Sequence, residues 1–431
     1  MLKKILLICM AALCCCLQRG ALAAEPLKVS IVEGQATAEV SCEDEFTVTA
    51  SGTGETVTMP KGKYFLHLQD GGLKLDENSR GNLGSRIIIR AAEGKAQPQI
   101  NKREYYGDYA VYVKDNNISV INRVDPELYL ACVLPAKTMP VWPDEVIKAQ
   151  AVAARSYLLY MMGAAGGGYD ISANDAELPY YGRGERYEKE AVTRLIKATA
   201  GQYLAYGGRP ARAVTTSSSG GRTESALNAW GEEIAYLQSV VDYDSDSPDY
   251  RWENRIAPFI IRNLLEQRGF RVGQLQSVRL SPLDEPGVDR TSTGRVRYII
   301  FSGSEGMARV GGRELADMLG LNSCLFDVET GIPVPDKLDV PIENGYGYQI
   351  GSKEIDIKVS ENDAPVWKNV ARSYHLISGS KEERIVFKGR GKGHGVGLSA
   401  WEARGMANAS AKNTYRAILA HYYPGTVLMK K

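Results

Sequence analysis

The residues best suited to polar recognition gather in two short stretches of this sequence. TTSSSGGRTES, at 215–225, places hydroxyl side chains and two glycines around Arg222, and GRGKGHGVG, at 389–397, alternates glycine with other residues around His394. Hydroxyl groups both donate and accept hydrogen bonds, and glycines beside an imidazole leave room for a ligand to approach it closely. Both stretches therefore predict a site for a polar ligand. A flexible linker and a turn histidine without a role are the alternatives.

Several familiar catalytic and metal motifs are excluded by their spacing. The glycines at 389–397 recur at every second residue, which fits neither G-x-G-x-x-G nor a phosphate loop. No G-x-S-x-G is present, and four histidines offer no zinc ligand set. The acids from Asp242 to Glu253 have calcium-loop spacing, but Ser247 stands where that loop needs glycine. We predict no metal and no cofactor, and we interpret these acids as a solvated loop.

The chemistry that remains is that of a hydroxyl-rich and aromatic surface. Besides 215–225, this surface is predicted to contain His394, Tyr180, Tyr181, Trp230 and Trp252. Sugars suit such a surface, because their hydroxyls need many hydrogen bonds and their C–H faces stack on aromatic rings. Cleavage of a glycosidic bond would also need a carboxylic acid. Glu224 and Glu177 are candidates by spacing, and each also fits a solvated acid.

The N-terminal residues have the pattern of a secretory signal peptide. Lys3 and Lys4 precede an apolar run of thirteen residues from Ile5 to Leu17, and Ala21-Leu22-Ala23 fits a cleavage site. Thirteen apolar residues are too few to span a hydrocarbon core of about 30 Å. We therefore expect residues 1–24 to be removed. The protein is then secreted or extracytoplasmic in the cell envelope, with no stable membrane span.

The remaining composition is that of a soluble globular protein. Of the 431 residues, 44% are hydrophobic and 24% are charged. The predicted leader contains three basic residues and no acidic one, so the chain that remains after its cleavage has a slightly negative net charge. This charge argues against nucleic acid as a partner. Only Cys42, Cys132 and Cys324 follow the leader. They predict three buried thiols, with one disulfide and a spare thiol as the alternative.

The elements that must position these residues alternate between β-rich and helical parts. Amphipathic or alanine-rich patterns predict a helix from Pro143 to Met162, one ending at Ala200, one at 257–269 and one beginning near Ser399. Short β-branched runs predict strands elsewhere, including 235–241, and a hairpin is expected at Gly207-Gly208. These patterns predict an α+β protein with a helical central core flanked by β-rich segments. The expected parts are the leader (1–24), a β-rich N-terminal region (25–125), a core with helices and the Ser/Gly stretch (126–270), a β-rich subdomain (271–388) and a loop with a C-terminal helix that completes the core (389–431).

The sequence resembles the sporulation stage II protein D and amidase-enhancer LytB family of bacterial cell-wall proteins, and the matching segments follow the same order along the chain. The resemblance rests on VINRVDPELYLACVLPAKTMPVWPDEVIKAQAVAARSY (120–157), ARAVTTSSSGGRTESALNAWG (211–231), YLQSVVD (236–242), GRGKGHGVGLS (389–399) and YYPGT (422–426). It implies an exported protein that acts on peptidoglycan. One branch of the family resembles lytic transglycosylases that cut peptide-free glycan strands, and another stimulates a separate wall amidase. The resemblance also implies that 215–225 forms a cleft wall.

The sequence departs from the family where its chemistry is expected. The family pattern places a proposed catalytic glutamate before Met-Pro, and here Lys137 stands at that position, or Thr138 if Met139 sets the alignment. Neither side chain has a carboxylate that could relay a proton. The region where some members bind zinc reads DAELP at 175–179. The usual Ser-Gln pair after the glycine-histidine stretch is Ser399-Ala400.

Two functions of different class follow from the resemblance. The first is a helper that binds glycan strands and presents them to an amidase or another hydrolase. The second is a lytic transglycosylase that uses a relocated acid. Arg155 fits either function, because it could orient a sugar acetamide or carboxylate, or pair with a buried acid. The substrate-binding residues that the resemblance implies are Lys137, Thr138, Gln150, Arg155, Ser217, Ser218, Ser219, Gly220, Gly221, Arg222, Thr223, Trp230 and His394.

Overall fold

The chain folds into two compact units in this computed structural model. Unit 1 comprises Met1–Arg212 with Met429–Lys431, and unit 2 comprises Ala213–Leu428. The structure describes residues 25–76, 82–138, 141–166, 168–184, 189–331, 337–343, 349–356 and 372–431, with no side chains described in 337–343 and 349–356. The predicted leader lies outside these residues. None of the described helices is long and apolar enough to cross a membrane.

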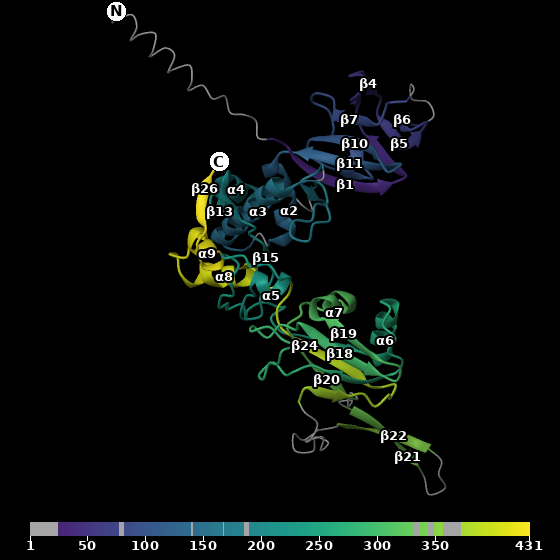
Figure 1. Cartoon of the computed structure of the whole chain (residues 1–431), viewed down its shortest axis with the longest axis vertical. Coiled ribbons are helices and arrows are strands. Elements are labelled where there is room, and N and C mark those ends of the chain that lie inside the picture. The colour runs from purple at the N-terminus through teal and green to yellow at the C-terminus, as the bar shows by residue number, and fades with distance from the viewer. Residues whose placement is uncertain are drawn as a thin grey trace, which may run out of the picture. The chain divides into compact units, whose positions relative to one another are not determined.

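Unit 1 begins with two β-sheets that contact each other through β11, β2 and β5. The larger sheet has the order β12-β1-β11-β10-β7-β3-β4 and the smaller one β6-β5-β2-β8-β9 (Figure 1). The strands of the larger sheet are β1 (Leu27–Gln35), β3 (Phe46–Ala50), β4 (Thr56–Met59), β7 (Arg86–Ala91), β10 (Asp108–Lys114), β11 (Asn117–Val124) and β12 (Ile171–Ser172). Those of the smaller sheet are β2 (Thr37–Cys42), β5 (Gly62–Gln69), β6 (Gly72–Leu75), β8 (Gln99–Ile100) and β9 (Arg103–Glu104). Strands such as β3 bury every second residue, as expected when one face of a sheet covers a core.

The rest of unit 1 is helical, with one small sheet. Its elements are α2 (Pro126–Lys137), α3 (Asp144–Ala164), α4 (Glu190–Ala198), β13 (Gln202–Tyr206), β14 (Arg209–Pro210) and β26 (Val427–Lys430). The alanines of α3 are buried, which lets α2, α4 and β13 contact this helix. The Ser156 hydroxyl accepts a hydrogen bond from the Leu204 amide at 2.8 Å and thereby fixes β13 to α3. α3 thus organises this half of the unit.

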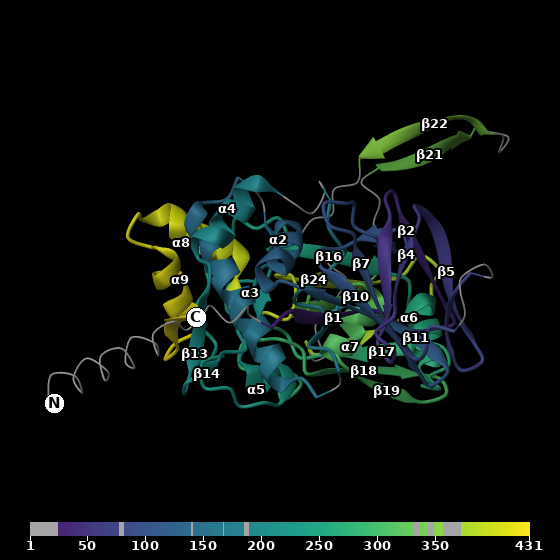
Figure 2. The same cartoon turned by 90° about the horizontal axis from the view of Figure 1, so that it is seen from above.

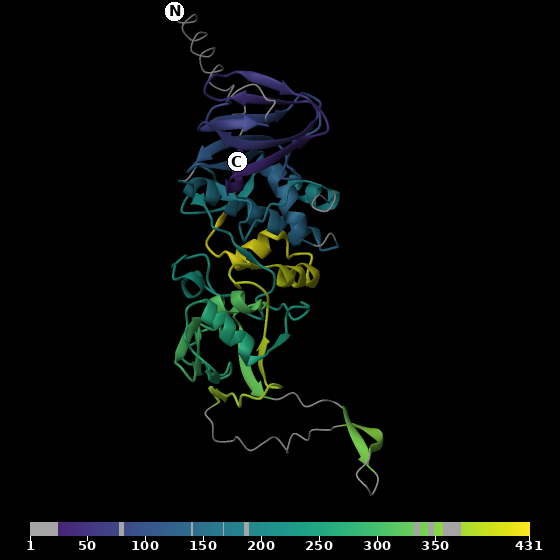
Figure 3. The ribbon, with the colours of Figure 1, turned by 90° about the vertical axis from the view of Figure 1, so that its right-hand side faces the viewer.

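Unit 2 contains a β-rich part with two sheets and two helices. Their orders are β19-β18-β17-β23 and β16-β24-β20, and in Figure 3 the yellow β24 lies among green strands that precede it by many residues. The elements are β16 (Trp252–Ile256), β17 (Leu275–Arg279), β18 (Tyr298–Gly303), β19 (Met307–Gly311), β20 (Phe326–Gly331), β23 (Tyr374–Leu376), β24 (Arg384–Gly389), α6 (Pro258–Gln267) and α7 (Gly312–Leu319). Phe301, Phe326 and Phe387 are fully buried in the core between these elements. A separate hairpin is formed by β21 (Lys337–Glu343) and β22 (Gln349–Asp356).

The other part of unit 2 joins segments from both ends of the unit. Its elements are β15 (Thr215–Thr216), α5 (Ala226–Trp230), β25 (Leu398–Ser399), α8 (Ala400–Ala409) and α9 (Tyr415–Tyr422). β15 pairs in parallel with β25, which brings the two polar stretches together. Helices α8 and α9 contact each other (yellow in Figure 2).

The expected α+β fold is confirmed, and so are the helices that become α3, α4, α6 and α8. The predicted strand at 235–241 is wrong. That segment is irregular and pairs with the chain only through single backbone bonds, such as Thr223 N to Val240 O at 2.9 Å. The segment runs beside residues 221–223 without a continuous ladder of hydrogen bonds, so its β-branched residues do not form a strand.

Candidate functional site

The two polar stretches form one structure in unit 2. Ser218 and Lys392 exchange backbone hydrogen bonds at 3.2 and 2.8 Å, and the Glu224 amide donates to the Gly395 carbonyl at 2.8 Å. With the β15–β25 pair, these bonds join 215–224 to 392–399 along their length. The Ser/Gly loop, defined here as residues 217–223, is therefore a fixed element and not a free linker.

The alternating glycines at 389–397 are explained by this close packing. Gly391 has φ +72°, and a Cβ there would lie 2.7 Å from the Ser218 carbonyl oxygen. Gly397 has φ +73°, and its Cβ would lie 2.1 Å from the Val214 carbonyl oxygen. Both the left-handed backbone and the short distance require glycine. The space that we had assigned to an approaching ligand is occupied at these positions by the chain itself.

Several hydroxyls of the Ser/Gly loop face the interior. Ser218, Ser219 and Thr223 are each 0% exposed. The Ser218 hydroxyl donates to Asp244, and the Thr223 hydroxyl accepts a hydrogen bond from the Val240 amide at 2.7 Å. A short loop without a backbone ladder satisfies its polar groups in this way. These hydroxyls hold the loop together and are not presented to a ligand.

The groups at the surface of this structure are Arg222, Trp230 and His394. Arg222 is exposed, and its Nε donates to the Ser239 hydroxyl at 2.9 Å. Trp230 and His394 are half-buried, with ring centroids 5.4 Å apart and planes at 58°. His394 Nδ1 accepts the Val396 amide proton at 3.0 Å, so the neutral imidazole carries its proton on Nε2. We call Trp230 and His394 the aromatic pair.

Glu224, one of the two candidate acids, is a buried structural carboxylate. It is 1% exposed. Its oxygens accept hydrogen bonds from the Ser225 amide at 2.8 Å, Asn228 Nδ2 at 3.0 Å and the Thr291 hydroxyl at 2.7 Å, and also from the Thr293 hydroxyl. Four donors satisfy both oxygens. The carboxylate therefore connects α5 to residues 291–293 and is not placed to protonate a ligand.

Of the acids that we had interpreted as a solvated loop, Asp242 and Asp244 are buried, whereas Asp246 and Glu253 are exposed. Asp242 is 2% and Asp244 is 0% exposed, and they lie with Glu402 of α8, which is 5% exposed. We call these three residues the acid cluster. The solvated interpretation was wrong for Asp242 and Asp244, because their partners come from the Ser/Gly loop, α8 and α9. Spacing within 242–253 carries no information on those segments.

The acid cluster has perturbed protonation. Burial, followed by the charge on Asp242, raises the pKa of Glu402 to about 7, whereas a hydrogen bond from the Tyr243 backbone lowers it. Burial also raises the pKa of Asp242, which the nearby Ser219 hydroxyl lowers. Desolvation disfavours the charged form of a carboxyl group, and a neighbouring negative charge adds to this effect. The cluster thus favours one bound proton near neutral pH.

The predicted aromatic residues do not all reach the surface. Tyr180 is fully buried in unit 1, where its ring lies 5.0 Å from Tyr105 and 4.8 Å from Tyr129 between centroids. Tyr181 beside it is 43% exposed. Trp252 is half-buried in unit 2 and donates from Nε1 to the Gly391 carbonyl at 2.9 Å, so it supports the glycine-histidine stretch from within.

The predicted site residues of unit 1 form a second polar group at the end of α2. Lys137 Nζ lies 3.8 Å from Glu177 Oε2 and also donates to the Glu177 carbonyl oxygen. The Lys137 side chain is 29% and that of Glu177 14% exposed. Thr138 is buried, and its hydroxyl donates to the Leu134 carbonyl. The position that resembles the family's glutamate therefore holds an ammonium group paired with another acid.

Arg155 and Gln150 lie inside unit 1. Arg155 is 3% exposed and binds Glu127 with two bonds, Nε to Oε1 at 2.6 Å and Nη2 to Oε2 at 2.8 Å, while Nη1 donates to the Gln202 carbonyl at 2.9 Å. Of the two roles considered for Arg155, the structure thus shows the pairing with an acid. Gln150 is 5% exposed, and its Oε1 has no hydrogen-bond partner. Both side chains are placed to support the helical half of the unit.

Cysteines and metal ligands are sparse in the described residues. Cys42 and Cys132 are buried thiols, as predicted, whereas Cys324 is partly exposed. Burial raises the pKa of Cys42. No group of three His, Cys, Asp or Glu side chains is arranged to hold a metal ion within the part of the chain that the structure describes.

Comparison with known proteins agrees with this organisation. Residues 114–206 match the family model described as Stage II sporulation protein, SpoIID. The amidase enhancer of Bacillus subtilis is 24% identical over 410 residues, which cover 91% of this chain and 52% of that protein. Stage II sporulation protein D of the same organism is 24% identical over 321 residues, covering 71% of this chain and 75% of the relative. Residues 114–206 of this chain are thus similar to the SpoIID family. An uncharacterized protein of Brachyspira hyodysenteriae is likewise 24% identical over 383 residues, or 88% and 84% of the two chains.

Within the SpoIID match lie α2, α3 and α4, and with them Lys137 and Arg155. The Ser/Gly loop and the aromatic pair lie outside it, and the chain spans about half of the amidase enhancer's length. Sequence reasoning missed Glu402 as a partner of Asp242. The only signal was the density of acids near the Ser/Gly loop, and it does not reveal which of them are buried.

Proposed function

We propose that this protein is a SpoIID-type protein that is exported, binds the glycan strands of peptidoglycan and assists cell-wall remodelling in the manner of an amidase enhancer. The match of residues 114–206 to the SpoIID family model supports the cell-wall role. The name of one relative, an amidase enhancer, supports a wall amidase or another hydrolase as the partner.

The observation that carries the proposal is the aromatic pair in unit 2. Trp230 and His394 have tilted rings 5.4 Å apart, and the same two polar stretches carry the exposed side chains of Arg222 and Lys392. Aromatic faces stack on sugar C–H groups, and cationic donors bind sugar hydroxyl and carboxylate oxygens. Arg222 Nε is held by Ser239, which fixes the direction of the guanidinium. A saccharide is the ligand class that uses both features.

A helper function is favoured over an enzyme because, among the described residues, neither the position of the expected glutamate nor Glu224 offers a carboxyl group to a ligand. Lys137 stands where the resemblance places the glutamate, and Glu224 is fully engaged by four donors. An acid catalyst acts only within hydrogen-bond reach of the leaving oxygen, with a pKa suited to giving up a proton.

The second candidate function is a lytic transglycosylase that uses Glu177. Its carboxylate lies 3.8 Å from Lys137 Nζ, beside the position of the expected glutamate, and is partly exposed. A neighbouring ammonium favours the ionised carboxylate, which opposes a role as proton donor. We therefore keep this function as the alternative.

Incubation of the purified protein with peptide-free glycan strands tests both functions. Co-sedimentation measures binding, and mass spectrometry of the soluble fraction detects anhydro-muramyl ends. We expect the protein to sediment with the glycan and no such ends to form. Failure to sediment would overturn the binding proposal. Anhydro-muramyl ends that disappear in Glu177→Gln would establish the enzyme instead.

A further inference from the structure

The acid cluster beneath the Ser/Gly loop contains oxygens without partners. Asp244 Oδ1 and Glu402 Oε2 are buried and make no hydrogen bond, whereas Asp242 has the buried Ser219 and Ser399 hydroxyls beside it as donors. Their residues are between 0% and 5% exposed. A buried carboxylate oxygen without a donor is costly, and neighbouring carboxylates repel each other. Asp244 and Glu402 therefore each keep one oxygen without a proton donor.

The groups around the cluster are a phenol, an imidazole and the buried guanidinium of Arg295, whose Nε and Nη1 have no hydrogen-bond partner. From α9, the Tyr422 hydroxyl donates to Asp242 Oδ1 at 2.8 Å, and the neighbouring His421 contacts the Val241 carbonyl through Nε2 at 3.1 Å. Arg295 reaches the Ser/Gly loop, but its Nη2 donates to the Ser219 carbonyl at 2.8 Å. Among the described residues, only burial, two aspartates and a backbone hydrogen bond shift the pKa of Glu402, which lies at about 7.

The Ser/Gly loop is attached directly to this cluster. Asp244 Oδ2 accepts hydrogen bonds from the Gly220 amide at 3.0 Å and from the Ser218 hydroxyl, and the Asp242 amide donates to the Gly221 carbonyl at 3.1 Å. The helix that carries Glu402 is attached as well, because the Trp401 amide donates to the Ser217 carbonyl at 3.3 Å. A change in repulsion among the carboxylates is thus transmitted to the Ser/Gly loop, which contains Arg222.

We propose that Asp242, Asp244 and Glu402 hold one proton at Glu402 and that this proton positions the Ser/Gly loop. The protonated Glu402 removes one of the like charges that Asp242 and Asp244 would otherwise oppose. Loss of the proton leaves three buried anions, which loosens the loop. Glu402 is a positioning residue for the surface of the proposed function, but its protonation is measurable without any glycan.

Unfolding as a function of pH tests the proton directly. The unfolded chain releases the Glu402 proton near 4.5 and the folded chain near 7, so this group lowers stability progressively between those values and changes nothing further above them. Glu402→Gln keeps the shape without the charge. We expect its melting temperature to equal that of the native chain at pH 4.5, and to exceed it by a margin that grows up to pH 7 and then stays constant.

Glu383→Gln is the matched control, since Glu383 is also buried at 3% exposure in unit 2. Its carboxylate accepts hydrogen bonds from the Ser378 amide, the Ser378 hydroxyl and the Gly379 amide at 2.9 Å each. This variant should lower the melting temperature at pH 8. In a further variant, Asp242→Asn, loss of the neighbouring charge should move the pH-dependent step of the native chain to lower pH, which tests the proposal even if Glu402→Gln does not fold.

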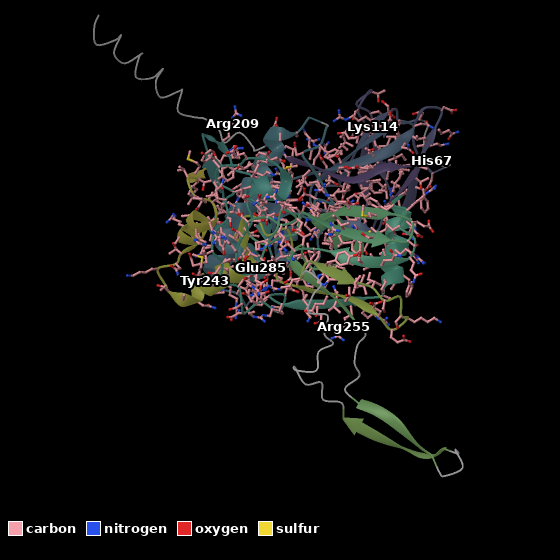
Figure 4. The ribbon with its side chains drawn as sticks, turned by 60° about the horizontal axis from the view of Figure 1, so that its bottom comes forward. His67, Lys114, Arg209, Tyr243, Arg255 and Glu285 are labelled. Atoms are coloured by element: carbon pink, nitrogen blue, oxygen red, sulfur yellow. The ribbon has the colours of Figure 1, made fainter. Side chains whose placement is uncertain are left out.

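Trypsin cleavage after Arg222 locates the effect in the loop. At pH 8 we expect faster cleavage there in the native chain than in Glu402→Gln, with equal cleavage after the exposed Arg255 (labelled in Figure 4). Equal cleavage after Arg222 would overturn the positioning role, and a Glu402→Gln that is less stable at every pH would overturn the bound proton. So would Ca²⁺ that stabilises the native chain but not Glu402→Gln, because the cluster would then be a cation site.

Discussion

At the scale of single residues, the role of each polar side chain depends on which partners reach it. Arg222 and Ser218 belong to the same loop, yet one is exposed and the other is 0% exposed and donates to Asp244. Glu224 and Glu177 were equivalent candidates by spacing. Four donors enclose Glu224, whereas Glu177 is paired with Lys137 and partly exposed.

The aromatic pair should contribute most to glycan binding. Trp230→Ala removes the larger stacking surface, and we expect its affinity for peptide-free glycan to fall about tenfold, since an aromatic stack is worth about 0.5–1.5 kcal/mol beyond the area it buries. Co-sedimentation over a range of glycan concentrations measures the change. Tyr243→Ala is the control, because Tyr243 is 74% exposed in the same unit (Figure 4). Equal losses in both variants would argue against a specific pair.

Glu224 should matter for stability and not for catalysis. Glu224→Ala removes the acceptor that the Thr291 and Thr293 hydroxyls share, so that they can bond only to each other, and one unsatisfied buried donor costs about 1–3 kcal/mol. We expect the free energy of unfolding in urea to fall by at least this amount. Glu285→Ala, at an exposed acid labelled in Figure 4, should change it by less than about 0.5 kcal/mol. An unfolding curve unchanged by Glu224→Ala would contradict the structural role.

At the scale of elements, the parallel β15–β25 pair explains both polar stretches. It brings residues separated by more than 170 positions into register, Thr215 with Leu398 and Thr216 with Ser399. The glycines that follow β24 turn the chain so closely along the Ser/Gly loop that side chains would collide with its backbone. The alternation of glycine is thus a packing requirement of this element pair.

Substitution of a packed glycine should be far more costly than substitution of an open one. Gly397→Ala places a Cβ 2.1 Å from the Val214 carbonyl oxygen in a left-handed backbone, whereas Gly320→Ala, at φ +64°, meets nothing within 4 Å. We expect Gly320→Ala to cost about 1 kcal/mol, from backbone strain alone. Gly397→Ala should lower the melting temperature several times more. Similar melting temperatures would mean that close packing does not explain the alternation.

At the scale of the whole molecule, the chain leaves unit 1 at Arg212 and returns to it only with Met429–Lys431. β26 completes the three-stranded sheet beside β13, and the Lys431 amide donates to the Gly201 carbonyl at 2.9 Å. The predicted site residues divide accordingly, with Lys137, Thr138, Gln150 and Arg155 in unit 1 and the others in unit 2. The sequence showed no boundary at Arg212, because no linker-like composition marks it.

Removal of Met429–Lys431 should therefore weaken unit 1, although these residues are last in the chain. Loss of the β26 ladder bonds should cost on the order of 1 kcal/mol for each net hydrogen bond. Differential scanning calorimetry measures this as a lower melting temperature. Replacement of the three residues by serines keeps the backbone bonds and should cost less. Equal destabilisation in the two variants would show that the side chains, and not the ladder, hold the end of the chain.

Local patterns in the sequence were sufficient for the α+β class, the helices α3, α4, α6 and α8, and the family resemblance, because periodicity, capping residues and short motifs act over neighbouring residues. These local patterns were also sufficient to single out the Ser/Gly loop and His394 as candidates for a polar binding site. Only the tertiary structure decided which of their groups face solvent. Burial of Asp242 and Asp244 depends on Glu402 and Tyr422, more than 150 residues further along, and the desolvation that raises the Glu402 pKa exists only once those segments meet.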